Sequence, residues 1–347
     1  MTKVLTIGSA TMDVFVECDD ANIVSVCSKN KNSDFMSYPY GSKIDITTFS
    51  SNVGGGGVNT ACNFANLGFE TAAIFKIGED IYSEGILDSF KNRNVDLKNI
   101  IQKQDTSTGF SIILVSFQGD RTVLAHRGAN AEIQESEINF DAIKEADLIY
   151  VAPLNGESNK VLEPIVEYAH QIGTRICFNA GTTSIKRGFE HIKTILKSAH
   201  IVVMNKEEAT MTTGIQVRPD TKTEKFSHEL IHRDIKKMLT AMKVMDYQII
   251  VITDGGKGAY AYDGQKFYFC PVFPSPVVST LGAGDAFAST FCGALERTKL
   301  NVGLSLMYAS VNSSCVVSEF GATEGLADFN KIEEKLRSNP EYTYLEG

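Results

Sequence analysis

A run of small residues beside one carboxylate is the part of the sequence best suited to chemistry. In the segment VSTLGAGDAFA, Gly282, Ala283 and Gly284 directly precede Asp285. Such small residues allow backbone N–H groups to face an anion, and the start of a following helix adds favourable potential for negative charge. A carboxylate here would repel a phosphate, so its presence favours a general base that takes a proton from an attacking hydroxyl. The simpler alternative is an acidic residue that stabilises the first turn of a helix.

A second glycine cluster, GGGGVN, precedes a segment with helical spacing. It contains Gly55, Gly56, Gly57 and Asn59. The glycines leave room for a ligand against the backbone, and the amide offers a donor and an acceptor to a polyol; a flexible turn into a helix is the alternative. The first predicted strand is followed only by Gly8, so a dinucleotide fingerprint is missing, and the sequence has no Walker A motif.

Short apolar, β-branched segments alternate with helical patterns along the chain. They lie at 4–8, 71–78, 147–153, 174–181, 200–205 and 247–256. This alternation predicts an α/β fold with a mostly parallel sheet covered by helices, in which ligands gather at the carboxyl ends of the strands. Asp13, Asn179, Asn205 and Thr253 each end or follow such a segment. The sequence therefore predicts a site at that edge of the sheet.

Two regions break this alternation. Residues 106–127 predict a hairpin around the turn 118–120, and residues 11–17 and 43–49 also alternate between apolar and polar. We expect a small antiparallel sheet, formed by about 11–17, 38–52 and 106–127, that acts as a lid, a homodimer interface, or both. The polar segments 25–42 and 216–228 are expected to be loops.

Composition limits the class of protein. The 347 residues are 43% hydrophobic, which predicts one α/β domain over 1–347 with the lid as an appended element. The net charge is −9, without a long basic run, which argues against nucleic acid as a partner. The seven cysteines form no C-x-x-C pair, which argues against a zinc ribbon and a disulfide framework. We expect a cytoplasmic protein without a membrane partner, because a signal peptide and long apolar runs are missing.

The two glycine clusters, in this order, resemble the two signatures of the ribokinase family, also called the PfkB carbohydrate kinases. The first is matched over GGGVNTACNFANLG and the second over STLGAGDAFAS. Three further elements follow the family order: the start from Gly8 to Asp13 resembles its substrate-binding first loop, NKEE its N-x-x-E element, and TDGGKG its nucleotide loop. The resemblance implies a ribokinase-like three-layer α/β/α fold and an ATP-dependent kinase.

The resemblance also implies roles for the residues of the site. Asp285 would be the general base, and Gly282, Ala283 and Gly284 would form an anion hole for the transferred phosphoryl group. The residues implied to hold the acceptor are Asp13, Gly55, Gly56, Gly57 and Asn59.

On the nucleotide side, Asn205 and Glu208 would position hydrated Mg²⁺, although a solvated first-turn glutamate is the simpler interpretation. The residues implied to border ATP are Thr253, Gly255 and Gly258, with Asn312 near adenine. For Asn312, an internal capping or packing role is the alternative.

Three departures limit what the resemblance implies. Ser279 stands where the family usually has Asp, and Gly325 stands where potassium-dependent members often carry Ser. Both changes should weaken a monovalent-cation site, so we expect weak or absent K⁺ activation. Gly56 stands where ribokinase itself tends to have Lys, so ribose is not favoured over other sugars.

The leading hypothesis is an ATP-dependent kinase acting on a primary hydroxyl of a sugar or sugar acid. Arg127 could bind a carboxylate of a sugar acid, although a surface arginine is the simpler interpretation. The alternative is a nucleoside kinase of the same family, in which lid aromatics contact a base; the candidates are Phe15, Tyr40, Phe110 and Phe117. A non-catalytic sugar sensor is disfavoured, because a pure binder needs no base at Asp285.

Overall fold

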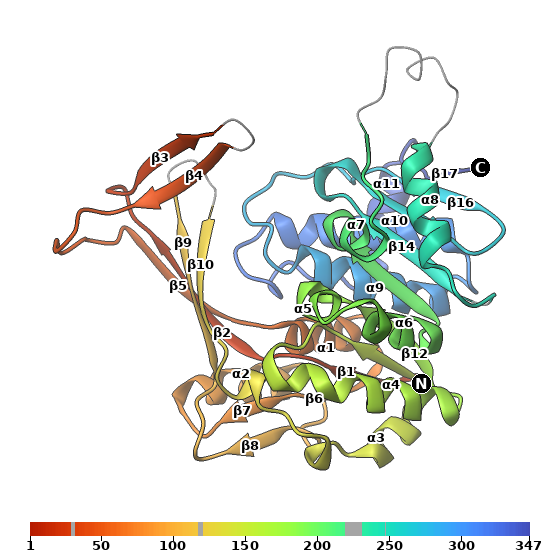
Figure 1. Cartoon of the computed structure of the whole chain (residues 1–347), viewed down its shortest axis with the longest axis horizontal. Helices are drawn as coiled ribbons and strands as arrows, with labels where there is room; N and C mark the ends of the chain where they lie inside the picture. The colour runs from red at the N-terminus through yellow and green to blue at the C-terminus, as the bar shows by residue number, and fades with distance from the viewer. Residues whose placement is uncertain (29–31, 117–120, 219–230, 247) are drawn as a thin grey trace.

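The computed structural model describes residues 1–28, 32–116, 121–218, 231–246 and 248–347. Its largest sheet has the strand order β17-β16-β15-β14-β13-β12-β11-β1-β6 (Figure 1). Six strands run parallel: β1 (Lys3–Ile7), β6 (Glu70–Ile74), β11 (Leu148–Val151), β12 (Arg175–Asn179), β13 (Ile201–Asn205) and β14 (Ile249–Thr253). The predicted parallel sheet is confirmed.

An antiparallel extension widens this sheet beyond what the sequence analysis predicted. It consists of β15 (Ala259–Tyr262), β16 (Phe267–Cys270) and β17 (Leu345–Glu346). These short strands are rich in aromatic residues, and Tyr262 and Phe267 stack with ring centroids 4.2 Å apart. The last strand brings the C-terminus of the chain to the sheet edge (Figure 1).

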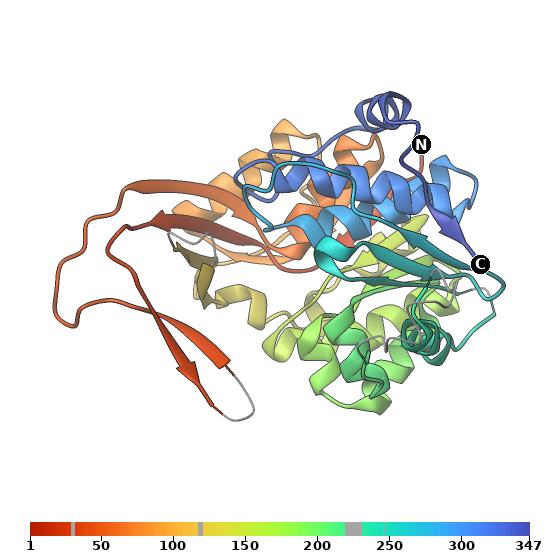
Figure 2. The ribbon, with the colours of Figure 1, turned by 90° about the horizontal axis from the view of Figure 1, so that it is seen from above.

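Helices cover both faces of the sheet, which explains its apolar strands. One face packs against α1 (Gly56–Asn66), α9 (Ala283–Arg297) and α10 (Val302–Val317). The other packs against α4 (Leu162–Gln171), α6 (Phe189–Ser198) and α8 (Arg233–Met242). Alternate residues of each strand enter opposite clusters, as Ile149 and Tyr150 do in β11. The result is the three-layer α/β/α arrangement that Figure 2 shows from above.

A smaller sheet stands off the main body where the sequence analysis predicted a lid, and we refer to this sheet as the lid (Figure 1). Its order is β10-β9-β2-β5, with β2 (Thr11–Glu17), β5 (Thr48–Gly54), β9 (Gly109–Val115) and β10 (Arg121–His126). The sheet is mixed rather than purely antiparallel, because β2 and β9 run parallel. The strand predicted over 43–49 begins later, because β5 starts at Thr48 and residues 43–47 lie before it. The predicted turn at 118–120 lies outside the described residues.

A hairpin replaces part of the loop expected over 25–42. It consists of β3 (Asn22–Cys27) and β4 (Asn32–Ser37), and it projects from the far end of the lid (Figure 2). Val24 and Phe35 pair across it and are 47% and 54% exposed. The segment NSDFMS of β4 shows no apolar–polar alternation, so the two-residue period of a strand is missing there, which is why the sequence analysis expected a loop. The other expected loop, 216–228, lies mostly outside the described residues.

One cysteine pair was not foreseen by the sequence analysis, which argued against a disulfide framework. Cys177 on β12 and Cys292 on α9 are bonded although they lie 115 residues apart. The bond is possible because α9 packs across this strand, which their spacing in the sequence does not reveal. In the part of the chain that is described, no group of three or more His, Cys, Asp or Glu residues is placed to hold a metal ion. No helix there has the length and apolar character needed to cross a bilayer.

The remaining helices lie around these layers. They are α2 (Ile81–Asn92), α3 (Phe140–Glu145), α5 (Gly181–Lys186), α7 (Lys206–Thr213) and α11 (Phe329–Ser338). Of these, α2 packs against the lid strand β2, where Met12 lies against Gly85.

Candidate active site

The two glycine clusters meet at the amino ends of α1 and α9. The side-chain amide of Asn59 donates from Nδ2 to Oδ2 of Asp285 at 2.8 Å, although the two residues are 226 positions apart. One turn later on α1, Asn63 donates to the hydroxyls of Ser289 and Thr290 on α9 at 2.7 and 2.8 Å. These hydrogen bonds fix the two helices side by side, which holds the carboxylate of Asp285 beside the glycine cluster at 54–57.

One atom of Asn59 remains without a partner. The residue is only 6% exposed, and Oδ1 is a buried acceptor that receives no hydrogen bond within the described part of the chain. The opposite end of the same amide is held by the carboxylate of Asp285, which fixes its orientation. A buried, unpaired acceptor is destabilising by about 1–3 kcal/mol unless a ligand or water satisfies it. Its position beside a carboxylate suits a ligand hydroxyl, which can donate to Oδ1.

The glycines before α1 allow its amino end to approach the first strand closely. The Gly57 N–H donates to the Ser9 carbonyl at 2.9 Å, and the Gly56 N–H to the Ser9 hydroxyl at 3.2 Å. A Cβ on Gly56 would lie 2.9 Å from Cβ of Ala152, and one on Gly55, where φ is +91°, would lie 2.6 Å from the Ser9 carbonyl oxygen. Close packing therefore accounts for these glycines, which the sequence analysis attributed to ligand contact or to a flexible turn.

Gly56 also borders the space beside the carboxylate. The nearest atom of Asp285 to a Cβ built there is Oδ1, at 3.7 Å. Of the three glycines, Gly56 thus lies nearest to the place where a ligand would meet Asp285, and its lack of a side chain keeps that place open.

Two aspartates of the site lie close enough for the charge of one to act on the other. Asp13 on β2 is 7% exposed, and burial raises the pKa of its carboxyl, although hydrogen bonds from Ser111 and Thr11 oppose the shift. Burial also raises the pKa of Asp285; the hydrogen bond from Asn59 lowers it, and the charge of Asp13 raises it further. Carboxyl groups with raised pKa values, placed together in a cleft, are typical of acid–base sites.

The glycine cluster at 282–284 forms an open helix start. Gly282 is left-handed with φ of +75°, and a Cβ there would lie 2.5 Å from Cβ of Ala322, so glycine is required. Among the described residues, no side chain caps this first turn. A Cβ on Gly284 would meet no described atom within 4 Å, so space for a ligand lies beside the backbone. Uncapped N–H groups next to open space form an anion-binding position.

A cavity of about 300 Å³ adjoins this helix start. The predicted residues that line it are Thr253, Gly255, Gly258, Ala283 and Gly284. The apolar residues Val272, Val277 and Phe287 complete much of its wall. The predicted nucleotide loop and the predicted anion hole therefore border one cavity, which has the size and mixed lining of a small-molecule site.

Asn312 does not line this cavity, although the sequence analysis expected it near adenine. Its side chain is fully buried, donates to Asn63 and Thr290 at 2.8 Å each, and accepts a hydrogen bond from the N–H of Ala327. Its hydrogen bonds join α1, α9 and α10, so the alternative packing role is the one the geometry supports. Its neighbours Ser310, Ser313 and Ser314 line the cavity instead.

Asn205 and Glu208 form a capping box at the start of α7. Asn205 accepts from the Glu208 N–H at 2.9 Å, and Glu208 accepts from the Asn205 N–H at 3.0 Å. Burial raises the pKa of Glu208, which is 8% exposed. Burial raises the pKa of the Tyr150 hydroxyl, and the charges of Asp285 and Glu208 raise it further. The sequence analysis did not identify Tyr150, which lies close enough to both carboxylates for their charges to act on it.

The lid places its predicted residues differently. Phe15 shares a face with Asp13, whereas Phe110 lies on the opposite face, with its ring 4.9 Å from that of Tyr82. Arg127 is exposed at the root of the lid. Tyr40 is fully exposed. Phe117 lies outside the described residues.

The sequence analysis also missed a contact between the lid and the helix start. The guanidinium of Arg121 donates to the hydroxyl of Thr280 at 2.6 Å. The signal available in the sequence for this contact was a basic residue, Arg121, at the start of a lid strand and next to the predicted turn.

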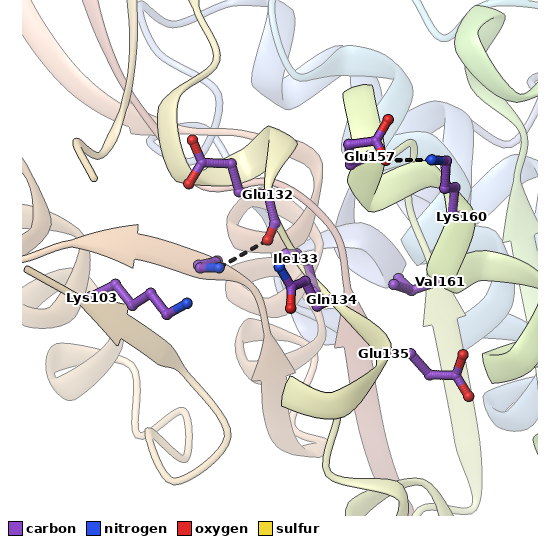
Figure 3. Close-up of a pocket in the computed structure, with 9 residues that line it drawn as sticks. Lys103, Glu132, Ile133, Gln134, Glu135, Glu157, Lys160 and Val161 are labelled. Carbon is purple, nitrogen blue, oxygen red and sulfur yellow. Dashed lines mark hydrogen bonds and ion pairs between the residues drawn. The ribbon is translucent and has the colours of Figure 1, made fainter. Parts of the chain in front are cut away.

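Another pocket, of about 500 Å³, lies away from these residues (Figure 3). The buried ammonium of Lys76 binds the carboxylate of Glu137 at 2.9 Å and the carbonyl of Glu132 at 2.8 Å. Lys160 pairs with Glu157 at its rim. Because these charges are paired within the protein, and because the predicted site residues lie elsewhere, we do not assign the reaction to this pocket.

Comparison with known proteins identifies the family of the chain. Residues 1–328 match the pfkB family of carbohydrate kinases. The chain is 25% identical over 340 residues to the ribokinase of Bacillus subtilis, covering 97% of this chain and 100% of that one. It is 26% identical to the bifunctional ribokinase/ribose-5-phosphate isomerase A of Fructilactobacillus sanfranciscensis, of which it spans 54%.

Solved structures share the fold at lower identity. The nucleoside kinase of Methanocaldococcus jannaschii superposes with a TM-score of 0.76 at 18% identity, over 97% of this chain and 99% of that one. The ribokinase of Arabidopsis thaliana, complexed with ribose and ATP, superposes with a TM-score of 0.74 at 19% identity and the same coverage.

Proposed function

The chain belongs to the pfkB family of carbohydrate kinases, and from its site we propose that it transfers the γ-phosphoryl group of ATP to a primary hydroxyl of a sugar or sugar acid. The observation that carries this proposal is the amide of Asn59. One end of it holds Asp285, and the other presents a buried, unpaired acceptor. A substrate hydroxyl bound between them meets an oxygen that accepts its proton and an oxygen that orients it.

In the proposed reaction, Asp285 takes the proton of the hydroxyl as the oxygen attacks the γ-phosphorus. A bond forms between that oxygen and phosphorus, while the bond between phosphorus and the bridging oxygen breaks and ADP leaves with the electron pair. The uncapped N–H groups from Gly282 to Gly284 stabilise the negative charge on the transferred group. Asp13 on the lid side holds other hydroxyls of the acceptor.

ATP is proposed to occupy the 300 Å³ cavity, with Thr253, Gly255 and Gly258 beside its phosphates and ribose. The residues present fit a hydrated magnesium ion, because a buried carboxylate at Glu208 lies near the site and Mg²⁺ prefers one or two carboxylates together with water and phosphate oxygens. Glu208 would hold it through water, and bound Mg²⁺ would neutralise phosphate charge.

A nucleoside is the second candidate acceptor, because the lid carries apolar side chains. Phe15, Ile113 and Val123 lie in one row across the lid, on the face that carries Asp13. Phe15 and Ile113 are 4% and 1% exposed, so a nucleobase could contact this row mainly at Val123, which is 46% exposed, whereas a sugar acid would instead use a cation such as Arg127.

We also propose that two copies of the chain associate through the outer face of the lid. Phe49 and Leu124 lie on the face opposite Asp13 and are 64% and 53% exposed. The helix α2 packs against β2 and does not cover these two positions, which are therefore open to solvent. Exposed apolar positions grouped on one sheet face are typical of protein–protein contacts.

The test is a coupled ADP-release screen over pentoses, hexoses, sugar acids and nucleosides, made with the wild-type protein and with Asp285→Asn. On the best acceptor, the substitution should lower kcat by about 10²–10⁴-fold and leave ATP affinity nearly unchanged. Asp88→Asn, at an exposed surface carboxylate paired with Lys91, is the matched control and should retain activity. Near-normal turnover of Asp285→Asn would reject the base.

A further inference from the structure

Resting on the proposed phosphoryl transfer, we propose that Arg121 is a catalytic residue that the lid delivers to the anion hole, where its guanidinium binds the oxygens of the transferred phosphoryl group. In this role, the phosphate-binding site is complete only when the lid brings Arg121 to it. The lid would then bind the transferred phosphoryl group through Arg121 as well as the acceptor through Asp13.

The first support is a long-range contact. Arg121 begins β10, and its Nη1 donates to Oγ1 of Thr280 at 2.6 Å across 159 residues of sequence. Thr280 lies two residues before Gly282 and lines the same cavity as Ala283 and Gly284. The guanidinium is therefore already beside the loop proposed to bind the γ-phosphoryl group.

The second support is the face of the lid from which Arg121 projects. In the strand register, Arg121 is level with Val115 and Glu17, and Asp13 lies four residues from Glu17 on β2. Residues paired across neighbouring strands share a face, and Asp13 and Glu17 are an even number of positions apart, so all four side chains lie on one face of the sheet. That face carries Asp13, whose charge acts on Asp285. The lid thus directs a carboxylate and a guanidinium towards the same cleft.

The third support is the charge of the site. Asp13, Asp285 and Glu208 bring carboxylates around the place where a triphosphate would transfer its terminal group. Lys206, a nearby cation, is paired with the carboxylate of Asp254. Arg121 instead contacts a neutral hydroxyl, which leaves its charge available to an anion.

A guanidinium suits this role because its planar donors match phosphate oxygens in pairs. On transfer, it would exchange the Thr280 hydroxyl for oxygens of the γ-phosphoryl group, whose negative charge is spread over those oxygens in the transition state. The proton still goes to Asp285 and ADP still leaves with the bridging oxygen, so Arg121 gains and loses no proton.

The experiment compares Arg121→Ala, Arg121→Lys and Arg121→Gln on the best acceptor from the ADP-release screen. Loss of the charge should lower kcat by about 10²–10³-fold in the Ala and Gln variants, and Lys should retain more activity than Gln. Millimolar guanidinium chloride should raise kcat of Arg121→Ala at least fivefold and leave the wild type unchanged. Lys43→Ala removes an exposed cation elsewhere on the chain and should retain wild-type kcat.

A purely structural latch gives a different pattern. If Arg121 only ties the lid to Thr280, Gln can still donate to that hydroxyl and should retain kcat, Lys should offer no advantage, and guanidinium should not rescue Ala. Either this pattern or wild-type kcat in all three variants would overturn the inference. Circular dichroism and ATP affinity of each variant show whether it is folded.

Failure of the inference is distinguishable from failure of the proposed function. A wild-type protein that turns over no acceptor in the screen would reject the proposed function and, with it, the inference. An active wild type, with Asp285→Asn inactive and Arg121→Gln fully active, would reject the inference alone.

Discussion

Replacing Asn59 by Ala tests the pairing of amide and base directly. The change removes the 2.8 Å hydrogen bond to Asp285 and the buried acceptor Oδ1. A hydrogen bond to a charged group contributes about 1.5–3 kcal/mol, and one to a neutral hydroxyl about 0.5–1.5 kcal/mol. At 1.36 kcal/mol for each tenfold change in rate, kcat/KM should fall by roughly 10²–10³-fold.

The pH profile of Asn59→Ala separates this reasoning from a general loss of packing. A general base must be deprotonated, so kcat/KM falls as pH decreases through the pKa of Asp285. Asn59 lowers that pKa, so its removal should move the acid limb of the profile to higher pH. The assay is coupled ADP release across pH, with Asn99→Ala as a control at an exposed amide that accepts from Asn139. A folded Asn59→Ala protein with an unmoved acid limb and kcat/KM within threefold of wild type would refute the pairing.

Three further predictions concern the same site and the lid. Asp13→Asn removes a charge that raises the pKa of Asp285, so the acid limb of the kcat/KM profile should move to lower pH; a move to higher pH would contradict the electrostatic coupling. Replacing choline chloride by KCl should change kcat by less than about twofold, because Ser279 lacks a carboxylate, and a large activation would reveal an intact cation site. The double variant Phe49→Ser and Leu124→Ser should sediment as a monomer at concentrations where the wild type is a dimer; a wild type that is itself monomeric would exclude the lid interface.

The sequence predicted the main sheet because its signals are local. Strands buried on both faces are short apolar runs, and glycine marks where the chain turns at their ends. Gly282 shows how such a signal works, since its positive φ and the neighbouring Ala322 exclude any side chain. The same local signal could not reveal that Gly55 and Gly57 pack against Ser9, because that contact depends on where β1 lies.

Features that depend on distant neighbours were missed or assigned differently. In the sequence, Asn312 is one polar residue within a predicted helix. Only the position of Asn63 in the structure shows that the Asn312 amide points towards α1 and is buried. Cys177 and Cys292 become partners only when α9 crosses β12. The hairpin β3–β4 alternates so weakly between apolar and polar that its pairing is visible only in the structure.

The hydrogen bonds of Asn63 to Ser289, Thr290 and Asn312 have a consequence for how new specificities could be built on this scaffold. They join three helices beneath the reacting atoms without involving the smaller sheet. The proposed base therefore rests on the helical body, whereas Asp13 and Arg121 come from the smaller sheet. Grafting the projecting strands of a relative onto this body should exchange the compounds that are phosphorylated, provided that the graft keeps an aspartate and an arginine at these two positions.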